Sequence, residues 1–340
     1  MPSNDSVLVT GAAGYIGTHA CVQLIEAGYQ VVALDNLSNS SIKAMHRVYE
    51  LCGVSFPFYQ IDLRDAGKVK ACLHEHDISA VLHFAGLKSV AESVEQPLAY
   101  YQNNVVGSIN LLMAMKAVGV RKIVFSSTAT VYGLPDKSPV NEQAAIRPVN
   151  PYGVTKNVVE GVLRDLCASD ASWRASSLRY FNPIGAHPTG LIGESPRGRP
   201  NNLMPYITQV ASGQREALAI YGDDYNTPDG TGVRDYIHVQ DLVGAHLKGL
   251  LFLGSTTGYS VFNLGTGSGQ SVLDVVKAFE DATGISIAYK IVERRPGDVD
   301  EYYADPSLAK ADLQWQASLG LEEMCRDSWA WQKANPKSFE

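Results

Sequence analysis

One stretch decides the fold: Val7-Leu-Val-Thr-Gly-Ala-Ala-Gly-Tyr-Ile-Gly17. A short aliphatic and β-branched run enters a turn that contains three glycines. An apolar stripe at helical spacing follows from Thr18 to Glu26, and Gly28 ends it. Val31 to Leu34 then has the composition of a second buried strand. A glycine-rich turn between strand and helix lets the backbone approach a pyrophosphate, to which the helix N-terminus offers free amides. The stretch therefore predicts a dinucleotide-binding βαβ unit.

Asp35 follows the second strand, 18 residues after Gly17. A carboxylate at this place binds the ribose hydroxyls of adenosine, and it selects NAD over its 2′-phosphorylated relative. A glycine triplet alone is a weak signal. In the order strand, turn, helix, strand and Asp it becomes specific, and it predicts NAD as the cofactor.

Further buried strands are expected at Phe56–Ile61, Ala80–Phe84 and Ile123–Ser126, with helices between them. This rhythm predicts an α/β fold, a Rossmann-type doubly wound parallel sheet with a smaller C-terminal α/β substrate lobe. We expect the NAD-binding domain to cover residues 1–183 and the substrate lobe residues 184–340, with 236–253 packing back on the first domain. Ligands of such sheets bind at the carboxyl ends of the strands.

Composition limits the classes of function. A net charge of −7 argues against nucleic-acid binding and against a membrane surface, and no apolar run reaches transmembrane length. Met1–Ser6 is too short and polar to be a signal peptide. The five cysteines form no Cys-x-x-Cys pair, and His187 and His238 have no further ligands at suitable spacing. We therefore expect a cytoplasmic protein with neither a metal site nor a disulfide framework.

Tyr152 and Lys156 stand four residues apart, so on a helix they share one face. A nearby ammonium favours the phenolate and lowers the pKa of tyrosine, which makes it a usable base. About one such pair is expected by chance in a chain of this length. Alone, the pair is better explained as a stray Tyr and Lys on an exposed helix.

Two predicted helices, Leu98–Val118 and the one beginning at Tyr152, carry more apolar positions than packing on one sheet face requires. In the first, Tyr101, Val105, Ile109, Leu112 and Met113 are expected to form one face. A homodimer built from these helices is the hypothesis, with packing inside one chain as the alternative.

Several further motifs narrow the choice of family. They are His83–Lys88 (HFAGLK), Ser126–Gly133 (SSTATVYG), Arg179–Pro183 (RYFNP), Asn201–Tyr206 (NNLMPY) and Asp229–His238 (DGTGVRDYIH). With the glycine turn and the Tyr-x-x-x-Lys pair, they make the chain resemble the UDP-glucose 4-epimerases of the extended short-chain dehydrogenase/reductase superfamily. The resemblance runs from Val7 to about Trp331.

The resemblance implies roles for residues along the whole chain. The residues implied to contact NAD are Gly11, Gly14, Tyr15, Ile16, Gly17, Asp35, Asn36, Asn39, Ser40, Asp62, Leu63, Phe84, Ala85, Lys88, Asn103, Tyr152, Lys156 and Tyr180. Those implied to contact the UDP-hexose are Lys88, Thr128, Tyr152, Asn182, Asn202, Leu203, Ala219, Tyr221, Arg234, Arg295, Asp298 and Tyr302. Catalysis is implied for Tyr152, Lys156 and Thr128, where the family often has serine.

The implied reaction interconverts UDP-glucose and UDP-galactose through a transient 4-keto-hexose, with hydride held on tightly bound NAD. Tyr152 takes the 4-hydroxyl proton, and Tyr302 limits the width of the sugar site and disfavours N-acetylated sugars. The alternative is that Tyr302 packs in the core and that Tyr303 or a loop movement sets this width. Dehydratases and decarboxylases of the superfamily share most of the site but carry carboxylates after the catalytic hydroxyl, where this chain has Ala129 and Thr130. An inactive NAD-binding protein is the alternative from another class, and the presence of all three catalytic residues disfavours it.

Overall fold

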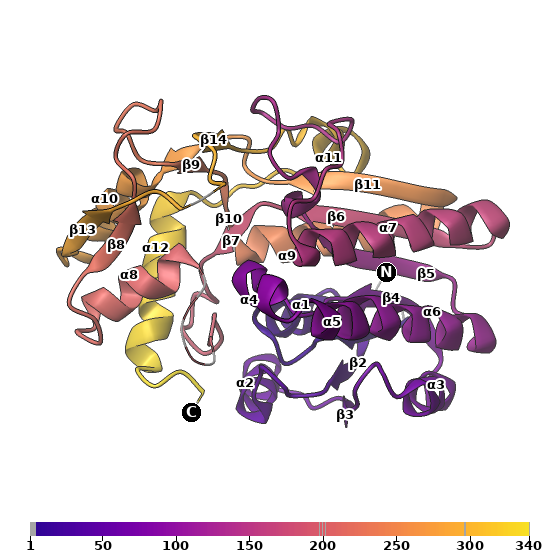
Figure 1. Cartoon of the computed structure of the whole chain (residues 1–340). Helices are drawn as coiled ribbons and strands as arrows, with labels where there is room; N and C mark the ends of the chain where they lie inside the picture. The colour runs from indigo at the N-terminus through magenta and orange to yellow at the C-terminus, as the bar shows by residue number, and fades with distance from the viewer. Residues whose placement is uncertain (1–4, 197, 199, 201, 296, 340) are drawn as a thin grey trace.

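In the part of the chain that the structure describes (residues 5–196, 198, 200, 202–295 and 297–339), the larger lobe is built on a seven-stranded parallel sheet. Figure 1 shows this computed structural model, with helices covering both faces of the sheet. The strand order is β11-β6-β5-β4-β1-β2-β3. The strands are β1 (Ser6–Thr10), β2 (Gln30–Asp35), β3 (Phe58–Gln60), β4 (Ile78–His83), β5 (Lys122–Thr128), β6 (Arg174–Tyr180) and β11 (Gly258–Leu264).

The order reverses between β1 and β4, which is the topological switch point where doubly wound folds bind ligands. The predicted fold class is confirmed. Each predicted strand is present, with its ends shifted by at most two residues. Burial on both faces makes the central strands continuous apolar runs, which the sequence therefore indicates.

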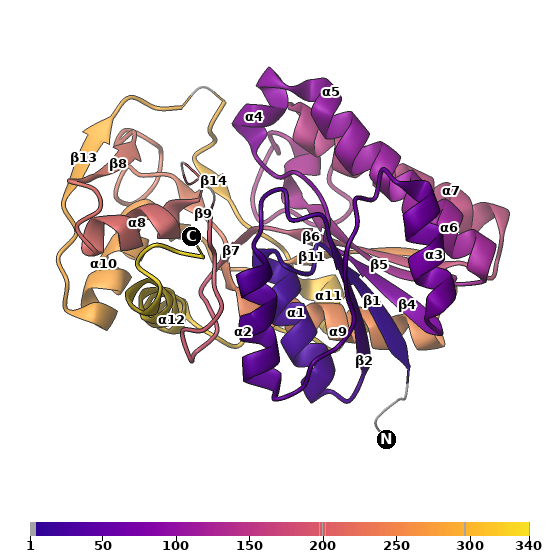
Figure 2. The same ribbon diagram turned by 90° about the horizontal axis from the view of Figure 1, so that it is seen from below.

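Two groups of helices bury the two faces of the sheet, as the view from below shows (Figure 2). One face is covered by α1 (Tyr15–Glu26), α2 (Ile42–Cys52), α9 (Val239–Ser255) and the short α11 (Ser307–Asp312). The other face is covered by α3 (Ala66–Glu75), α6 (Gly107–Val118) and α7 (Pro151–Ser169). Helix α9 packs against α1, β5 and β6, so residues 239–255 return to the larger lobe.

The predicted helix at 98–118 is interrupted. It consists of α5 (Pro97–Tyr100), a π-helical segment η1 (Tyr101–Val106) and α6, after the short α4 (Val90–Glu95). The expected single apolar face is wrong: Leu112 is buried, whereas Met113 is 65% exposed, because adjacent residues of α6 point to different sides of the helix.

The smaller lobe has its own core, built from α8 (Leu203–Ala211), α10 (Val272–Thr283), α12 (Leu321–Ala334) and short sheets. Strand β7 (Asn182–Ile184) pairs with β10 (Tyr236–His238), and β8 (Leu218–Tyr221) pairs with β13 (Tyr289–Val292). A third sheet joins β12 (Gln270–Ser271), β9 (Val233–Arg234) and β14 (Glu301–Tyr302). Across the described ranges, no helix has the length and apolar character needed to cross a membrane.

Candidate active site

A cleft of about 1310 Å³ opens at the carboxyl ends of the large sheet and is lined by residues of both lobes. Its lining runs from the glycine turn at Gly11 past Tyr152 to Arg295. A single small-molecule pocket usually has about 300–1,000 Å³, so this cleft has room for more than one ligand of ordinary size.

The glycine turn at the start of α1 fits a dinucleotide. A Cβ on Gly11 would lie 2.7 Å from the backbone nitrogen of Ala85, and a Cβ on Gly17 would lie 2.1 Å from the carbonyl oxygen of Gly11. Among the described residues, no side chain caps the first turn of α1, whose residues Tyr15 and Ile16 line the cleft. The unpaired amides at this helix N-terminus are therefore directed at a site for a phosphate.

Asp35 is buried and ties the glycine turn to the segment after β2. Its carboxylate accepts hydrogen bonds from the backbone N–H of Ala13 (3.0 Å) and Leu37 (2.8 Å) and from Ser40 Oγ (2.8 Å). Asn36 in turn donates to Asp62 at 2.8 Å. Both edges of the expected adenosine site are thus fixed by carboxylates.

The predicted catalytic residues meet where β5 ends beside the first turns of α7. Asn150 caps α7 by accepting from the N–H of Gly153 at 2.9 Å, which starts the helix so that Tyr152 and Lys156 face the cleft. Thr128 is the last residue of β5 and its hydroxyl bonds that of Tyr152. Lys156 Nζ donates to the carbonyl of Ser126 at 2.6 Å.

The pKa of Tyr152 differs from the sequence-based expectation. Burial raises it, and the bond with Thr128 opposes that rise. Lys156 does not produce the predicted lowering, because its Nζ bonds Ser126 and lies 4.8 Å from the Phe125 ring centroid. Burial lowers the pKa of Lys156 itself to about 8.

The loop after β4 carries Phe84, Ala85 and Lys88, and all three line the cleft together with Asn103. The next residue, Asn104, holds this loop: its Oδ1 accepts from the N–H of Leu87 at 2.8 Å and its Nδ2 donates to Thr155 Oγ1 at 3.1 Å. Asn104 lies in the π-helical segment, a feature that often marks functional sites.

The smaller lobe contributes the other wall of the cleft. Arg234 Nη2 lies 3.3 Å from the carboxylate of Asp298, and the Arg295 guanidinium lies 3.9 Å from the Tyr221 ring centroid. The remaining predicted residues on this wall also line the cleft, namely Asn182, Asn202, Leu203 and Ala219.

Two predicted contact residues do not line the cleft. Asp62 lies behind Asn36 and pairs with Arg64, which holds the pKa of the Asp62 carboxyl well below its usual range. Tyr302 packs on Phe181, with ring centroids 5.2 Å apart, and donates to the carbonyl of Ala129. Tyr302 therefore lies one layer behind the surface that Phe181 presents to the cleft.

Sequence reasoning missed several lining residues. Glu194 Oε1 accepts from both Lys88 Nζ (2.8 Å) and Asn202 Nδ2 (2.7 Å), joining the two lobes across the cleft. Tyr206 and Tyr225 also line it, with Arg215 and Arg294 respectively over their rings. Glu194 lies in a Gly-Glu-Ser-Pro run whose turn-forming residues gave no sign that its side chain reaches the other lobe.

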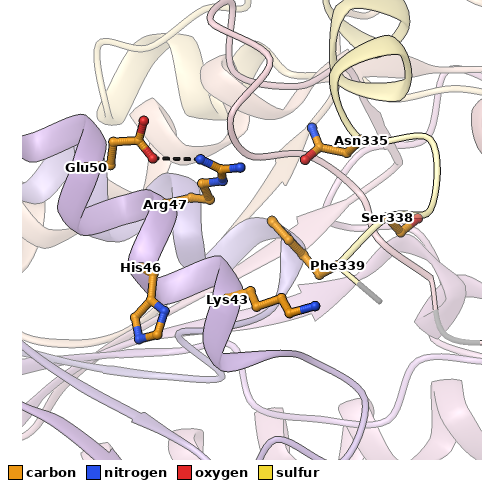
Figure 3. Close-up of a pocket in the computed structure, with 7 residues that line it drawn as sticks. All are labelled: Lys43, His46, Arg47, Glu50, Asn335, Ser338 and Phe339. Atoms are coloured by element: carbon orange, nitrogen blue, oxygen red, sulfur yellow. Dashed lines mark hydrogen bonds and ion pairs between the residues drawn. The ribbon is translucent and has the colours of Figure 1, made fainter.

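A second, smaller pocket of about 350 Å³ lies between α2 and the segment after α12 (Figure 3). Lys43, His46 and Arg47 line it from α2, and Asn335 and the neighbouring C-terminal residues line it from the other side. It contains no predicted site residue. Within the described ranges, no group of three His, Cys, Asp or Glu side chains could hold a metal ion.

Comparison with known proteins bears on this geometry. Residues 8–328 match the family model described as GDP-mannose 4,6 dehydratase. The chain is 54% identical to the UDP-glucose 4-epimerase of Bacillus subtilis (98% of this chain, 99% of that one) and 52% identical to the human one (98% of each). The chain belongs to the UDP-glucose 4-epimerase family.

Solved structures agree with this family. The UDP-glucose 4-epimerase of Stenotrophomonas maltophila with bound NAD and formylated UDP-arabinopyranose superposes with a TM-score of 0.96 at 51% identity, covering 98% of this chain and 99% of that one. The Bifidobacterium longum enzyme, in complex with NAD+ and UDP, gives 0.94 at 48% identity, covering 98% and 100%. These two UDP-glucose 4-epimerases bind a dinucleotide together with UDP or a UDP-sugar. Both classes of ligand were expected for this cleft from the sequence.

The description of the matching family model raises the dehydratase alternative again. In this member of the UDP-glucose 4-epimerase family, Thr128 is followed by a 3₁₀-helix, Ala129–Tyr132, that carries no carboxylate. Thr130 lines the cleft and its Oγ1 accepts from Thr128 Oγ1 at 3.0 Å. The loop thus presents two hydroxyl groups, those of Thr128 and Thr130, at the position where dehydratases have an acid and a base.

Proposed function

We propose that the chain interconverts UDP-glucose and UDP-galactose, through a 4-keto-hexose, with NAD held as a prosthetic group. One observation carries this proposal. Tyr152, Thr128 and Lys156 meet in a cleft that extends from the glycine turn to Arg295, and the loop after Thr128 offers no carboxylate.

The reaction itself explains the need for a redox group. The hydrogen on C4 of a hexose is not acidic, so acid–base chemistry alone cannot invert that carbon. NAD, when bound, would supply a reversible hydride acceptor for C4 and a cationic oxidised nicotinamide ring. Gly11, Gly17 and Asp35 would hold the pyrophosphate and the adenosine ribose, and the close approaches at the glycine turn support this fit.

Tyr152 acts as the base that takes the 4-hydroxyl proton. Burial favours its neutral form, so it needs nearby donors and positive charge to become a phenolate. The Thr128 hydroxyl opposes the effect of burial on Tyr152, and the Lys156 ammonium, one helical turn away, adds positive charge to the site although it does not by itself lower the pKa of Tyr152. As the sugar is reduced again, the same phenol returns the proton, since a group that accepts a proton in one direction donates it in the other.

The UDP moiety is gripped by the smaller lobe. Arg234 and Arg295 present planar guanidinium groups, which make paired charge-assisted bonds to phosphate. Asp298 and Tyr221 hold these two side chains in place. Firm binding of UDP leaves the hexose free to turn over, which inversion requires.

Two finer features belong to the same proposal. Tyr302 narrows the sugar site indirectly, through Phe181, and so disfavours N-acetylated sugars. A homodimer forms through α7 and the α5, η1 and α6 segment, where Leu98 is 79% exposed and Tyr101, Ile109 and Met113 are also exposed. A monomeric mass by light scattering at micromolar concentration would rule the dimer out.

Purified protein incubated with UDP-galactose, without added NAD, tests the proposed function. UDP-glucose is the expected product, at an equilibrium reached equally from either sugar, and denaturation of the enzyme should release NAD. A 4-keto-6-deoxy sugar as the product would replace this proposal with the dehydratase alternative. Recovery of unchanged UDP-galactose from protein shown to contain NAD would reject it.

A further inference from the structure

Behind the cleft lies a buried ion pair between Glu160 and Arg179. Their side chains are 0% and 3% exposed. Arg179 donates twice to the Glu160 carboxylate, from Nε at 2.9 Å and from Nη2 at 2.6 Å. Ser127 Oγ donates to the same carboxylate at 2.5 Å. The Glu160 carboxylate therefore accepts three hydrogen bonds from residues on two strands of the sheet, β5 and β6.

The free end of the guanidinium extends the network. Arg179 Nη1 donates to the hydroxyl of Tyr132 at 2.9 Å, and that hydroxyl donates to Asn263 Oδ1 at 2.7 Å. Asn263 lies on β11, and its Nδ2 donates to the carbonyl of Val140 at 2.9 Å. None of these described residues lines the cleft.

Three members of the network stand close in sequence to residues assigned to catalysis or to NAD. On α7, Glu160 lies one helical turn after Lys156, which is itself one turn after Tyr152. On β5, Ser127 directly precedes Thr128. On β6, Arg179 directly precedes Tyr180, which lines the cleft.

The 3₁₀-helix after Thr128 is held at both ends. Tyr132, its last residue, bonds Arg179, and Ala129, its first residue, accepts a hydrogen bond from Tyr302. The loop that separates epimerases from dehydratases is thus fixed to the sheet by the ion pair and to the smaller lobe by Tyr302.

Stability alone does not account for such a pair. Removing two charges from water is costly, and well-packed apolar residues of similar size usually stabilise a core as well or better. The neighbouring core is apolar, with Val159 and Leu163 on the same helix. A buried pair with four hydrogen bonds is instead suited to fixing the relative position of the elements that it joins.

We propose that the Glu160–Arg179 pair is a positioning device for the epimerase reaction, setting the distance between the Tyr152–Lys156 face of α7 and the Thr128 end of β5. The inference rests on the proposed function and adds to it two residues that touch neither ligand. Its physical basis is that a misplacement of about 1 Å in a reacting group can lower the rate about 100-fold.

Charge supports the same role. The carboxylate of Glu160 favours the ammonium form of Lys156, against the burial that lowers the pKa of that lysine to about 8. The positive charge of Arg179 neutralises the Glu160 carboxylate, so the pair lies near the site without adding net charge to it.

The test replaces both charges at once, with Glu160→Leu and Arg179→Met in one chain. This double variant keeps the volume and leaves no unpaired charge, so its thermal midpoint should stay near that of the wild type. We expect kcat for UDP-galactose to fall about 10- to 100-fold, with KM within about twofold and the NAD content unchanged. Glu160→Asp with Arg179→Lys, which restores a pair of opposite charges, should recover part of kcat.

Two further variants keep the test decisive. Ser127→Ala removes only one hydrogen bond of the network and should fold even if the double variant does not; its kcat should fall at least about threefold at constant KM. Leu253→Ala is the matched control, because Leu253 is buried at the far end of α9 and its truncation should lower the thermal midpoint without changing kcat.

The outcomes separate the two proposals. A wild type that does not epimerise UDP-galactose rejects the proposed function. A wild type that does, together with a folded double variant or Ser127→Ala whose kcat stays within twofold of it, overturns the positioning role. A loss of kcat in Leu253→Ala as large as in the double variant would also overturn it, because general destabilisation would then explain both.

Discussion

Replacing Lys156 with methionine should make the fold more stable while it abolishes activity. The lysine side chain is 5% exposed, and burial lowers its pKa from 10.5 to about 8. The lowered pKa means that the charge on Lys156 destabilises the native state. Methionine keeps the unbranched stem of the side chain and removes the ammonium.

The magnitude follows from the two pKa values. The charge destabilises the native state by about 3 kcal/mol at any pH below the native pKa of about 8, where folded and unfolded chains are both protonated. Between pH 8 and 10.5 the unfolded chain binds the proton more often, so the penalty shrinks, and above 10.5 it vanishes. The lost bond to the Ser126 carbonyl offsets about 1 kcal/mol, so Lys156→Met should be more stable by about 2 kcal/mol at pH 7.

Urea unfolding of both proteins from pH 7 to pH 10 measures this effect, with NAD removed from each because a bound ligand adds its own stabilisation. The advantage of the variant should decline above about pH 8 and disappear by about pH 10. Lys248→Met, at an exposed position of α9, is the control and should show no such trend. A difference that does not change with pH, or a variant less stable at pH 7, would refute the reasoning.

Four other changes test separate parts of the site. Tyr152→Phe should lower kcat by about 100- to 10,000-fold with little change in KM, and a loss below about tenfold would contradict its role as the base. Gly17→Ala places a Cβ 2.1 Å from the Gly11 carbonyl oxygen, so the purified variant should release little or no NAD on denaturation, whereas a full complement would disprove the close approach. Arg234→Met should raise KM for UDP-galactose about tenfold or more by removing a charge-assisted contact, and an unchanged KM would remove it from the UDP site. Tyr302→Ser should improve weak activity on UDP-N-acetylglucosamine, and equal wild-type rates on UDP-N-acetylglucosamine and UDP-galactose would exclude a role of Tyr302 in limiting the sugar site.

The parts of the site that could be predicted from the sequence are those whose contacts are local or follow from topology. The glycine turn and Asp35 lie in one βαβ unit, and the structure joins them directly through the N–H of Ala13. Parallel strands bring their carboxyl ends to one edge, so the loop at Ala85 and the end of β5 had to meet the same cleft.

Other features depend on contacts that no spacing indicates. The π-helical segment at Tyr101–Val106 divides a regular apolar pattern, because Asn104 inside it bonds the loop at Leu87. Glu194 reaches Lys88 across the two lobes, from a loop with no periodicity to interpret. The pKa of Tyr152 could not be predicted from its distance to Lys156 along a helix, since burial and the direction of the ammonium decide it.

The two buried charges on α7 show how the fold serves the reaction. Glu160 is fully paired, lies outside the cleft, and fixes the helix to β5 and β6. Lys156, one turn earlier, donates a hydrogen bond to the Ser126 carbonyl, packs on the Phe125 ring, and lines the cleft. Because Glu160 makes the contacts that hold α7 in place, the ammonium of Lys156 keeps N–H donors that can bind a ligand. A helix held through Lys156 itself would be equally firm, but it would have no charge to offer to the reaction.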